Sequence, residues 1–157
     1  AVLESFYRRH EGVNLPTGYF DEFCEDIRDP GILYVVAEHK GRIVGGGGLS
    51  ESGTGDHAIL SFGLVDPECC GRGFGTTILM SRLALISPKP EVCYVTIMAT
   101  EWSAPFFRRL GFIWHDSDED SSGNRFVHGY HQIWADDIRN LRFMLNRAGV
   151  TFEESLI

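Results

Sequence analysis

The chain has 157 residues, of which 43% are hydrophobic and 23% are charged, an ordinary balance for one folded domain. Its 14 basic and 22 acidic residues give a net charge of −8, which argues against nucleic acid as the main partner and mildly favours a cationic small molecule or peptide. No apolar run approaches the roughly 18 residues of a membrane helix and no signal peptide is visible, so we expect a single cytoplasmic domain, residues 1–157, without a membrane partner.

Two short amphipathic helices are predicted at the start of the chain. Residues 2–10 carry apolar side chains on one helical face, and a second helix runs from Tyr19 to about Ile27. Asp29-Pro30-Gly31 ends the second helix, because Pro cannot continue a helix and Gly turns freely.

A β-hairpin follows these helices. Residues 32–38 and 43–49 predict two strands that are joined by a turn at Gly41. The second strand contains four consecutive glycines, Gly45–Gly48. Glycine weakens a strand, so this run indicates either a bent strand packed under a helix or the close approach of a ligand.

The middle of the chain predicts a strand, a loop, a helix and another strand. Residues 57–65 and 92–98 are apolar enough to be central strands buried on both faces. Residues 76–86 have the length and composition of a helix that ends before Pro88. A short helix then follows Ser103, which we expect to cap it.

The last part of the chain predicts a hairpin and a helix. Residues 112–115 and 124–134 are the expected strands, separated by an acidic loop, Asp116–Asp120. This loop either steers a cationic acceptor or is simply solvated. The final helix begins near Asp136 and ends at Gly149. Together the elements predict an α/β chain of the mixed α+β kind, with a mixed sheet flanked by helices.

The most informative stretch is CCGRGFGTT, residues 69–77, between a predicted strand and the N-terminus of a predicted helix. Such an N-terminus offers unpaired N–H groups and the positive end of the helix dipole. Glycines remove the side chains that would hold a phosphate away from those groups, and Arg72 adds a permanent positive charge. We therefore expect a phosphate-bearing ligand, with a turn that serves packing alone as the alternative.

Two common phosphate-binding motifs do not fit this loop. A nucleotide-hydrolysing P-loop needs a second glycine where Thr76 stands and then a Lys, and no Lys follows. A dinucleotide-binding motif matches Gly71 and Gly73 but again finds Thr76 at its third glycine, and the preceding hairpin is wrong for that fold.

Two segments together carry a more specific resemblance. CGRGFG, residues 70–75, is similar to the Gln/Arg-x-x-Gly-x-Gly/Ala loop of the GNAT superfamily, the GCN5-related N-acetyltransferases. LSFGLVDPE, residues 60–68, leads into the loop as in that family, and SAPFFRRLGFI, residues 103–113, resembles its second signature. The resemblance covers roughly residues 32–134.

This resemblance implies a twisted sheet whose two central strands, residues 57–65 and 92–98, splay apart to admit acetyl-CoA. The pantetheine would pair with the strand edge near Val65, whose backbone would also stabilise the oxyanion, and the pyrophosphate would lie on the loop amides. The implied coenzyme-binding residues are Leu64, Val65, Cys70, Gly71, Arg72, Gly73, Phe74, Gly75, Thr76, Ser103, Phe106 and Phe107. The reaction would be direct acetyl transfer to a primary amine of a small molecule or peptide.

Two motif positions depart from the family pattern. Cys70 replaces the Gln or Arg that opens the loop, which removes a polar contact but leaves the backbone amides. Phe107 replaces a Tyr thought to protonate the leaving thiolate. Since a thiol has a pKa of about 8.5, its thiolate leaves fairly well without that help, and we expect a slower reaction rather than none.

The catalytic base is not evident. The strand positions that often carry it are Ile59 and Ser61 here, so Glu51 and His57 are the candidates for a base that acts through water. A catalytically silent acyl-CoA-binding module is therefore the alternative function, and turnover with amines separates the two hypotheses.

Other features complete the expectations. The family's usual first strand is not visible, so either the chain is truncated or the sheet begins at residue 32.

His128 and His131 would point to opposite faces of a strand, so we expect no metal site there. The four cysteines include the adjacent Cys69 and Cys70 and no Cys-x-x-Cys spacing, which favours reduced thiols. A homodimer through the final hairpin and helix would be consistent with the family.

Overall fold

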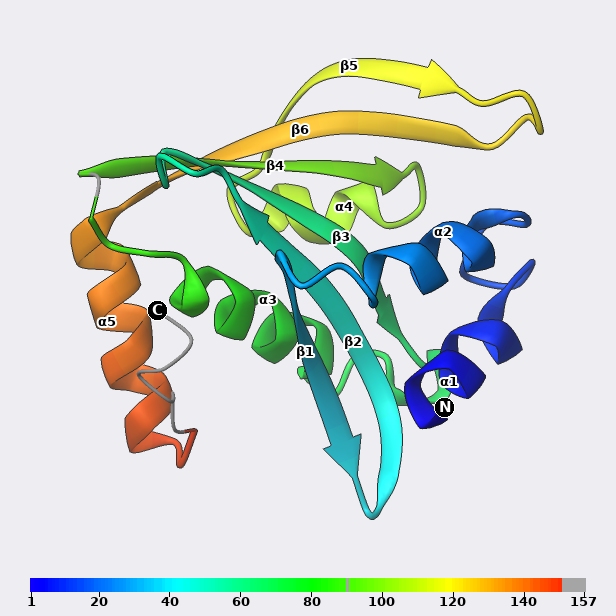
Figure 1. The fold of residues 1–157 in the computed structure, drawn as a ribbon, viewed down its shortest axis with the longest axis horizontal. Coiled ribbons are helices and arrows are strands. Elements are labelled where there is room, and N and C mark those ends of the chain that lie inside the picture. The colour runs from blue at the N-terminus through cyan, green and yellow to red at the C-terminus, as the bar shows by residue number, and fades with distance from the viewer. Residues whose placement is uncertain (90, 151–157) are drawn as a thin grey trace.

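The computed structural model describes residues 1–89 and 91–150, in which six strands form one mixed sheet with the order β1-β2-β3-β4-β6-β5 (Figure 1). The strands are β1 (Ile32–His39), β2 (Arg42–Glu51), β3 (His57–Val65), β4 (Val92–Thr100), β5 (Ile113–Glu119) and β6 (Arg125–Trp134). Neighbouring strands are antiparallel except β3 and β4, which are parallel. The predicted mixed α/β architecture is confirmed.

Helices lie on both sides of the sheet. The described helices are α1 (Val2–His10), α2 (Tyr19–Asp26), the 3₁₀ helix η1 (Pro67–Cys69), α3 (Phe74–Leu85), α4 (Ala104–Arg109) and α5 (Ala135–Arg147). Figure 1 shows α3 beside α5 on one side of the molecule and α1 beside α2 on the other. None of these helices has the length and apolar character needed to span a membrane.

Two hydrophobic clusters fill the two sides of the sheet. One joins α3 and α5 to the sheet and includes Leu60 and Ile138, and the other joins α1 and α2 to it and includes Phe23. Gly46 and Gly47 of β2 face different clusters, since successive residues of a strand face opposite sides of the sheet. A side-chain carbon at Gly46 would approach Tyr7 of α1, whereas one at Gly47 would meet Arg82 of α3.

Packing explains the run of four glycines in β2. An added Cβ would lie 2.8 Å from the Ile78 side chain at Gly45 and 2.8 Å from the Arg82 guanidinium at Gly47. All four glycines are buried. Of the two interpretations of this run, a strand packed closely under a helix is the one that the structure supports.

Two expectations about the sheet are wrong. The central strands are not buried on both faces, because α1 and α2 cover only part of the sheet, and Ile59, Tyr94 and Met98 stay 48%, 47% and 48% exposed. The expected acidic loop is mostly strand, since β5 continues to Glu119. As an edge strand with solvated side chains, β5 accommodates consecutive polar residues, whereas a central strand would have to bury half of them.

Candidate functional site

The parallel strands β3 and β4 are paired only at their beginnings. The pairing runs from His57 opposite Tyr94 to Leu60 opposite Ile97 and does not extend to the last residues of either strand. The strands therefore part from Ser61 onward (Figure 1). The predicted splay is confirmed, and it leaves the end of β3 without a β4 partner.

Backbone alternation directs Val65 toward the parted side. The Asp66 amide donates to the Val44 carbonyl of β2 at 2.8 Å. Residues one step apart on a strand point their main-chain groups in opposite directions, so the amide and carbonyl of Val65 point away from β2. Those of Leu64 point toward β2, where Leu64 pairs with Gly46. Of these two expected contact residues, only Val65 presents its main chain to the parted side.

A bulge in β3 lies next to this edge. Gly46 opposes Leu64, but Gly48 opposes Ser61, so β3 has one more residue than β2 between these pairs. Within the bulge, Phe62 has a φ of +45°, a conformation that bulky residues rarely adopt. The Tyr7 hydroxyl donates to the Phe62 carbonyl at 2.5 Å and thereby supports the bulge from α1.

The glycine loop leads directly into the N-terminus of α3. Gly71 and Gly73 have φ values of +74° and +87°, which only glycine adopts readily, and Gly73 is the residue that precedes the helix. A Cβ at either position would meet nothing within 4 Å, so both face open space. No side chain caps this helix, and its first amides, from Phe74 to Thr76, are therefore available to an anion.

The loop, the end of β3 and α4 meet at Gly75. An added Cβ there would lie 3.4 Å from the Phe106 ring and 3.7 Å from the Val65 side chain. Phe107, by contrast, is only 7% exposed and packs between the rings of Phe106 and Phe112. The structure therefore brings Val65, Gly75 and Phe106 together and places Phe107 in the core.

Two other expected site residues make local contacts instead. Ser103 precedes α4, but its hydroxyl donates to the Thr100 carbonyl at 3.1 Å and does not cap the helix, which corrects the expected N-cap. The exposed Cys70 directs its thiol to the Asp66 carbonyl, with 3.7 Å between sulfur and oxygen. Arg72 is exposed at the loop, as a phosphate ligand would require.

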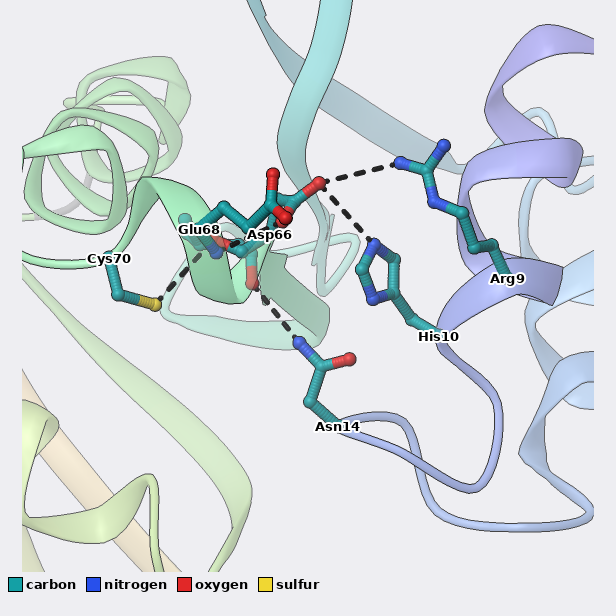
Figure 2. A network of polar contacts seen from close by, with 7 residues as sticks. Arg9, His10, Asn14, Asp66, Glu68 and Cys70 are labelled. Atoms are coloured by element: carbon teal, nitrogen blue, oxygen red, sulfur yellow. Dashed lines mark hydrogen bonds and ion pairs between the residues drawn. The ribbon is translucent and has the colours of Figure 1, made fainter.

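Asp66 connects the loop to α1, as Figure 2 shows. Its Oδ1 accepts a hydrogen bond from the Glu68 amide at 3.1 Å and caps η1. Its Oδ2 lies 3.5 Å from the Arg9 guanidinium and 3.9 Å from Nε2 of the buried His10. The sequence analysis assigned no role to Asp66, although Asp followed by Pro is a common start of a helical turn.

Glu51 and His57 lie at the other end of the strand pair. Glu51 ends β2, and its carboxylate accepts a hydrogen bond from the Ser87 amide at 2.9 Å. His57 begins β3, and its Nε2 lies 3.0 Å from the Thr96 hydroxyl. The paired segment separates both from the parted strand ends, so the structure does not place either expected base beside Val65.

A cavity of about 350 Å³ adjoins the parted strand ends. Its walls are residues 12–17 of the α1–α2 connection, residues 100–102 after β4, and residues 123–125 of the β5–β6 turn. Thr100 is the last residue of β4, and Asn14 donates through Nδ2 to the Val65 carbonyl at 3.1 Å. The cavity therefore includes the end of β4 and is linked to the end of β3 through Asn14, and the sequence analysis did not predict it.

The cavity lining contains one carboxylate, Glu101, one cation, Arg125, and the aromatic side chain of Trp102, and two further carboxylates contact its lining residues. Glu101 and Glu119 share one cation, Arg125, at 3.6 and 3.7 Å. Hydrogen bonds from Asn124 first, and then from Tyr19 and Ser122, lower the pKa of Asp120 to about 2, so this carboxylate is ionised at neutral pH. Trp102 is 64% exposed.

Other chemistry-bearing residues form no further site in the described part of the chain. His128 and His131 pair opposite Met98 and Val95, which face opposite sides of the sheet, so the two imidazoles diverge as predicted. Residues 1–89 and 91–150 contain no cluster of three His, Cys, Asp or Glu side chains that could hold a metal ion. All four cysteines are free thiols.

Comparisons with known proteins agree on the fold. The sequence pattern of the family described as acetyltransferase (GNAT) domain matches residues 10–128. Among solved structures, this chain is similar to the ribosomal-protein-S18-alanine N-acetyltransferase from Escherichia coli, with 15% identity, a TM-score of 0.60, and coverage of 73% of this chain and 77% of that one. The comparison with curated proteins found no match.

Two further solved structures share the fold. One is an aminoglycoside 6′-N-acetyltransferase complexed with coenzyme A, with 12% identity, a TM-score of 0.59, and coverage of 85% of this chain and 87% of that one. The other is nourseothricin acetyltransferase, with 21% identity, a TM-score of 0.55 and coverage of 66% of each chain, so this chain spans about two thirds of its length. At these identities the likeness establishes the architecture alone.

Proposed function

The chain belongs to the GNAT acetyltransferase family, and from this premise we propose that it transfers acetyl from acetyl-CoA directly to a primary amine of a small molecule or peptide. The parting of β3 from β4 beside the uncapped N-terminus of α3 carries the proposal. It provides a strand edge next to an anion site. Acetyl-CoA needs both, because its pantetheine arm would pair with the strand edge and its pyrophosphate would bind at the anion site.

The proposed phosphate site fits a pyrophosphate. The main-chain amides of Arg72 through Thr76 surround the start of α3, where the helix dipole favours negative charge. The open space in front of Gly71 and Gly73 leaves room for the phosphate oxygens. A related fold solved with coenzyme A supports this choice of ligand.

The proposed oxyanion donor is the amide of Val65. Its carbonyl is already hydrogen-bonded to Asn14, which leaves the amide as the main-chain group of Val65 directed at the parted side. A positioned backbone donor of this kind typically contributes about 10²–10³ in rate. The reacting amine would be held in the cavity that includes the end of β4 and that Asn14 links to Val65.

The reaction needs no nucleophile from the protein. The ammonium of the acceptor loses a proton to solvent, and the freed lone pair of its nitrogen forms a bond to the thioester carbon as the carbonyl electrons shift to oxygen. When the carbonyl re-forms, the C–S bond breaks, the thiolate leaves with the electron pair, and the nitrogen releases its second proton to solvent to give the amide. The buried Phe107 supplies no proton for this step, and the low basicity of a thiolate makes one unnecessary.

We expect a cationic acceptor. Glu101 and Arg125 line the cavity, and Glu119 and Asp120 lie just behind it, where they contact the lining residues Arg125 and Asn124. The excess of carboxylates over this one cation favours an ammonium group over an anionic or neutral substrate. The exposed Trp102 ring offers a face for cation–π contact. An amine with a second positive charge would use both features.

Calorimetry and turnover together test the proposal. We expect coenzyme A to bind the wild-type protein and Arg72→Glu to weaken binding about tenfold, since a charge-assisted contact is lost. Arg147→Glu, an equal charge change on α5, is the matched control and should bind as wild type. Thiol release from acetyl-CoA should then appear with polyamines, amino acids or peptide N-termini. Binding without turnover on any amine would favour the silent module, and no binding would contradict both.

A further inference from the structure

Arg82 of α3 is a buried cation without a carboxylate partner in the described chain. Its side chain is among the most enclosed charged groups, since the residue is only 2% exposed. One guanidinium nitrogen donates to the Gly48 carbonyl at 3.3 Å, and Nε has no hydrogen-bond partner. Among residues 1–89 and 91–150, no Asp or Glu forms an ion pair with it. Burying an unpaired charge is costly, so its presence calls for a function.

The guanidinium lies directly against the bulge of β3. A Cβ added to Gly63 would lie 3.2 Å from one of its nitrogens, and a Cβ added to Gly47 would lie 2.8 Å from the other. Gly63 itself is exposed and belongs to the parted segment of β3. Arg82 therefore lies beside an exposed part of the β3 backbone, two residues before Val65.

The guanidinium keeps its charge at neutral pH. Burial lowers the pKa of Arg82, while the nearby hydroxyl groups of Tyr7 and Tyr34 oppose this effect, and the resulting value is about 10. In the interior, where the dielectric constant is low, the field of such a charge is weakly screened over several ångströms. No carboxylate among the described residues pairs with this charge, so it is not cancelled at Gly63, the part of the parted β3 segment that lies beside the guanidinium.

We propose that Arg82 is a positioning residue for acetyl transfer, which packs against the bulge of β3 at Gly63 and lends its positive charge to the nearby strand edge where the thioester oxygen becomes negative. This inference rests on the proposed function. As the amine nitrogen bonds to the carbonyl carbon, an electron pair moves to oxygen, and the buried cation favours that displacement. The pair returns to carbon as the C–S bond breaks, and Arg82 keeps its proton throughout.

Variants that differ in charge test this role. Arg82→Met keeps much of the volume without the charge, and such replacements of buried charges are often neutral or stabilising. We expect its melting temperature to equal or exceed that of wild type, the KM for acetyl-CoA to change less than threefold, and kcat to fall about tenfold or more. Arg82→Lys should recover most of kcat. Ser81→Ala, a buried change on the same helix, should leave all three values near wild type.

Three outcomes would overturn the inference. The Arg82→Met and Arg82→Lys variants could have equal kcat values, or the fall in kcat could simply follow a loss of folded protein. The third outcome is a rise in the KM for acetyl-CoA with kcat unchanged. If Arg82→Met does not fold, Arg82→Gln against Arg82→Lys is judged by the same criteria. The infrared carbonyl stretch of bound [1-¹³C]acetyl-CoA gives a measure that needs no turnover. It should lie lower in wild type than in the neutral variants, and an equal frequency would reject the role of Arg82 even if the protein acetylates no amine.

Discussion

The side-chain amide of Asn14 donates to the main-chain carbonyl of Val65 at 3.1 Å, across 51 positions of the chain. This hydrogen bond joins the wall of the proposed acceptor cavity to the strand edge where the thioester would lie. Its geometry also explains why the Val65 carbonyl, unlike its amide, is not offered to a ligand.

Removal of the Asn14 side chain should loosen the contact between acceptor and strand. We expect Asn14→Ala to lose about 1 kcal/mol of stability, since one part-buried hydrogen bond disappears. The KM for the amine should rise more than the KM for acetyl-CoA, because Asn14 lines the cavity and lies away from the glycine loop. Urea denaturation and steady-state kinetics would measure both effects, with Asn146→Ala on the exposed side of α5 as control. Equal changes in both KM values would contradict this assignment.

Asp66 should couple the coenzyme loop to α1. In Asp66→Ala the cap of η1 and the contacts with Arg9 and His10 are all lost, so we expect about 1–2 kcal/mol of destabilisation. The affinity for coenzyme A should fall, because the segment that leads into the glycine loop is no longer fixed by its contacts with η1 and α1. Calorimetry on Asp66→Ala and on the exposed control Asp116→Ala measures this, and an unchanged affinity in the first variant would show that the loop keeps its shape without Asp66.

Phe107→Tyr should not produce a faster enzyme. The family resemblance assigns a proton donor to this position, but the ring is buried between Phe106 and Phe112. A hydroxyl placed there without a partner should cost about 1–3 kcal/mol of stability. We expect a lower melting temperature and a kcat no higher than that of wild type. A several-fold increase in kcat would mean that the hydroxyl reaches the leaving thiolate after all.

Asp120 should make stability depend on pH in the acid range. Its folded pKa of about 2 lies below the unfolded value of about 3.9, so the ionised carboxylate stabilises the fold above roughly pH 4 and this contribution disappears as the pH falls through about 2. Asp120→Asn should flatten that part of the stability curve. Denaturation between pH 2 and 5 would reveal it, and identical slopes for wild type and Asp120→Asn would show that the pH dependence does not come from Asp120.

Local features of the site were predictable because they depend on residue type. The glycines at 71 and 73 are visible in the sequence, and their positive φ values and position before α3 follow from the special freedom of glycine. The parting of the central strands was expected from the family resemblance, since nothing in the two apolar runs themselves indicates where their pairing stops.

The remaining features depend on packing between distant segments. Asn14, Asp66 and Arg82 acquire their roles only when α1 and α3 lie against opposite faces of β2 and β3, and no local pattern encodes those contacts. The same reason explains the error over burial of the central strands. An apolar run such as residues 57–65 does not state which part of the sheet the helices will cover, and Ile59 remains on an open face.

The most direct measurement is a titration of ¹⁵N-labelled protein with coenzyme A, followed through its backbone amide resonances. The largest shifts should occur at Gly73, Phe74, Gly75 and Val65, which line the start of α3 and the parted edge of β3, while Gly31 and Gly53 in distant turns should not move. Saturating coenzyme that leaves the first group unchanged, or shifts that gather elsewhere in the described chain, would contradict the proposed site.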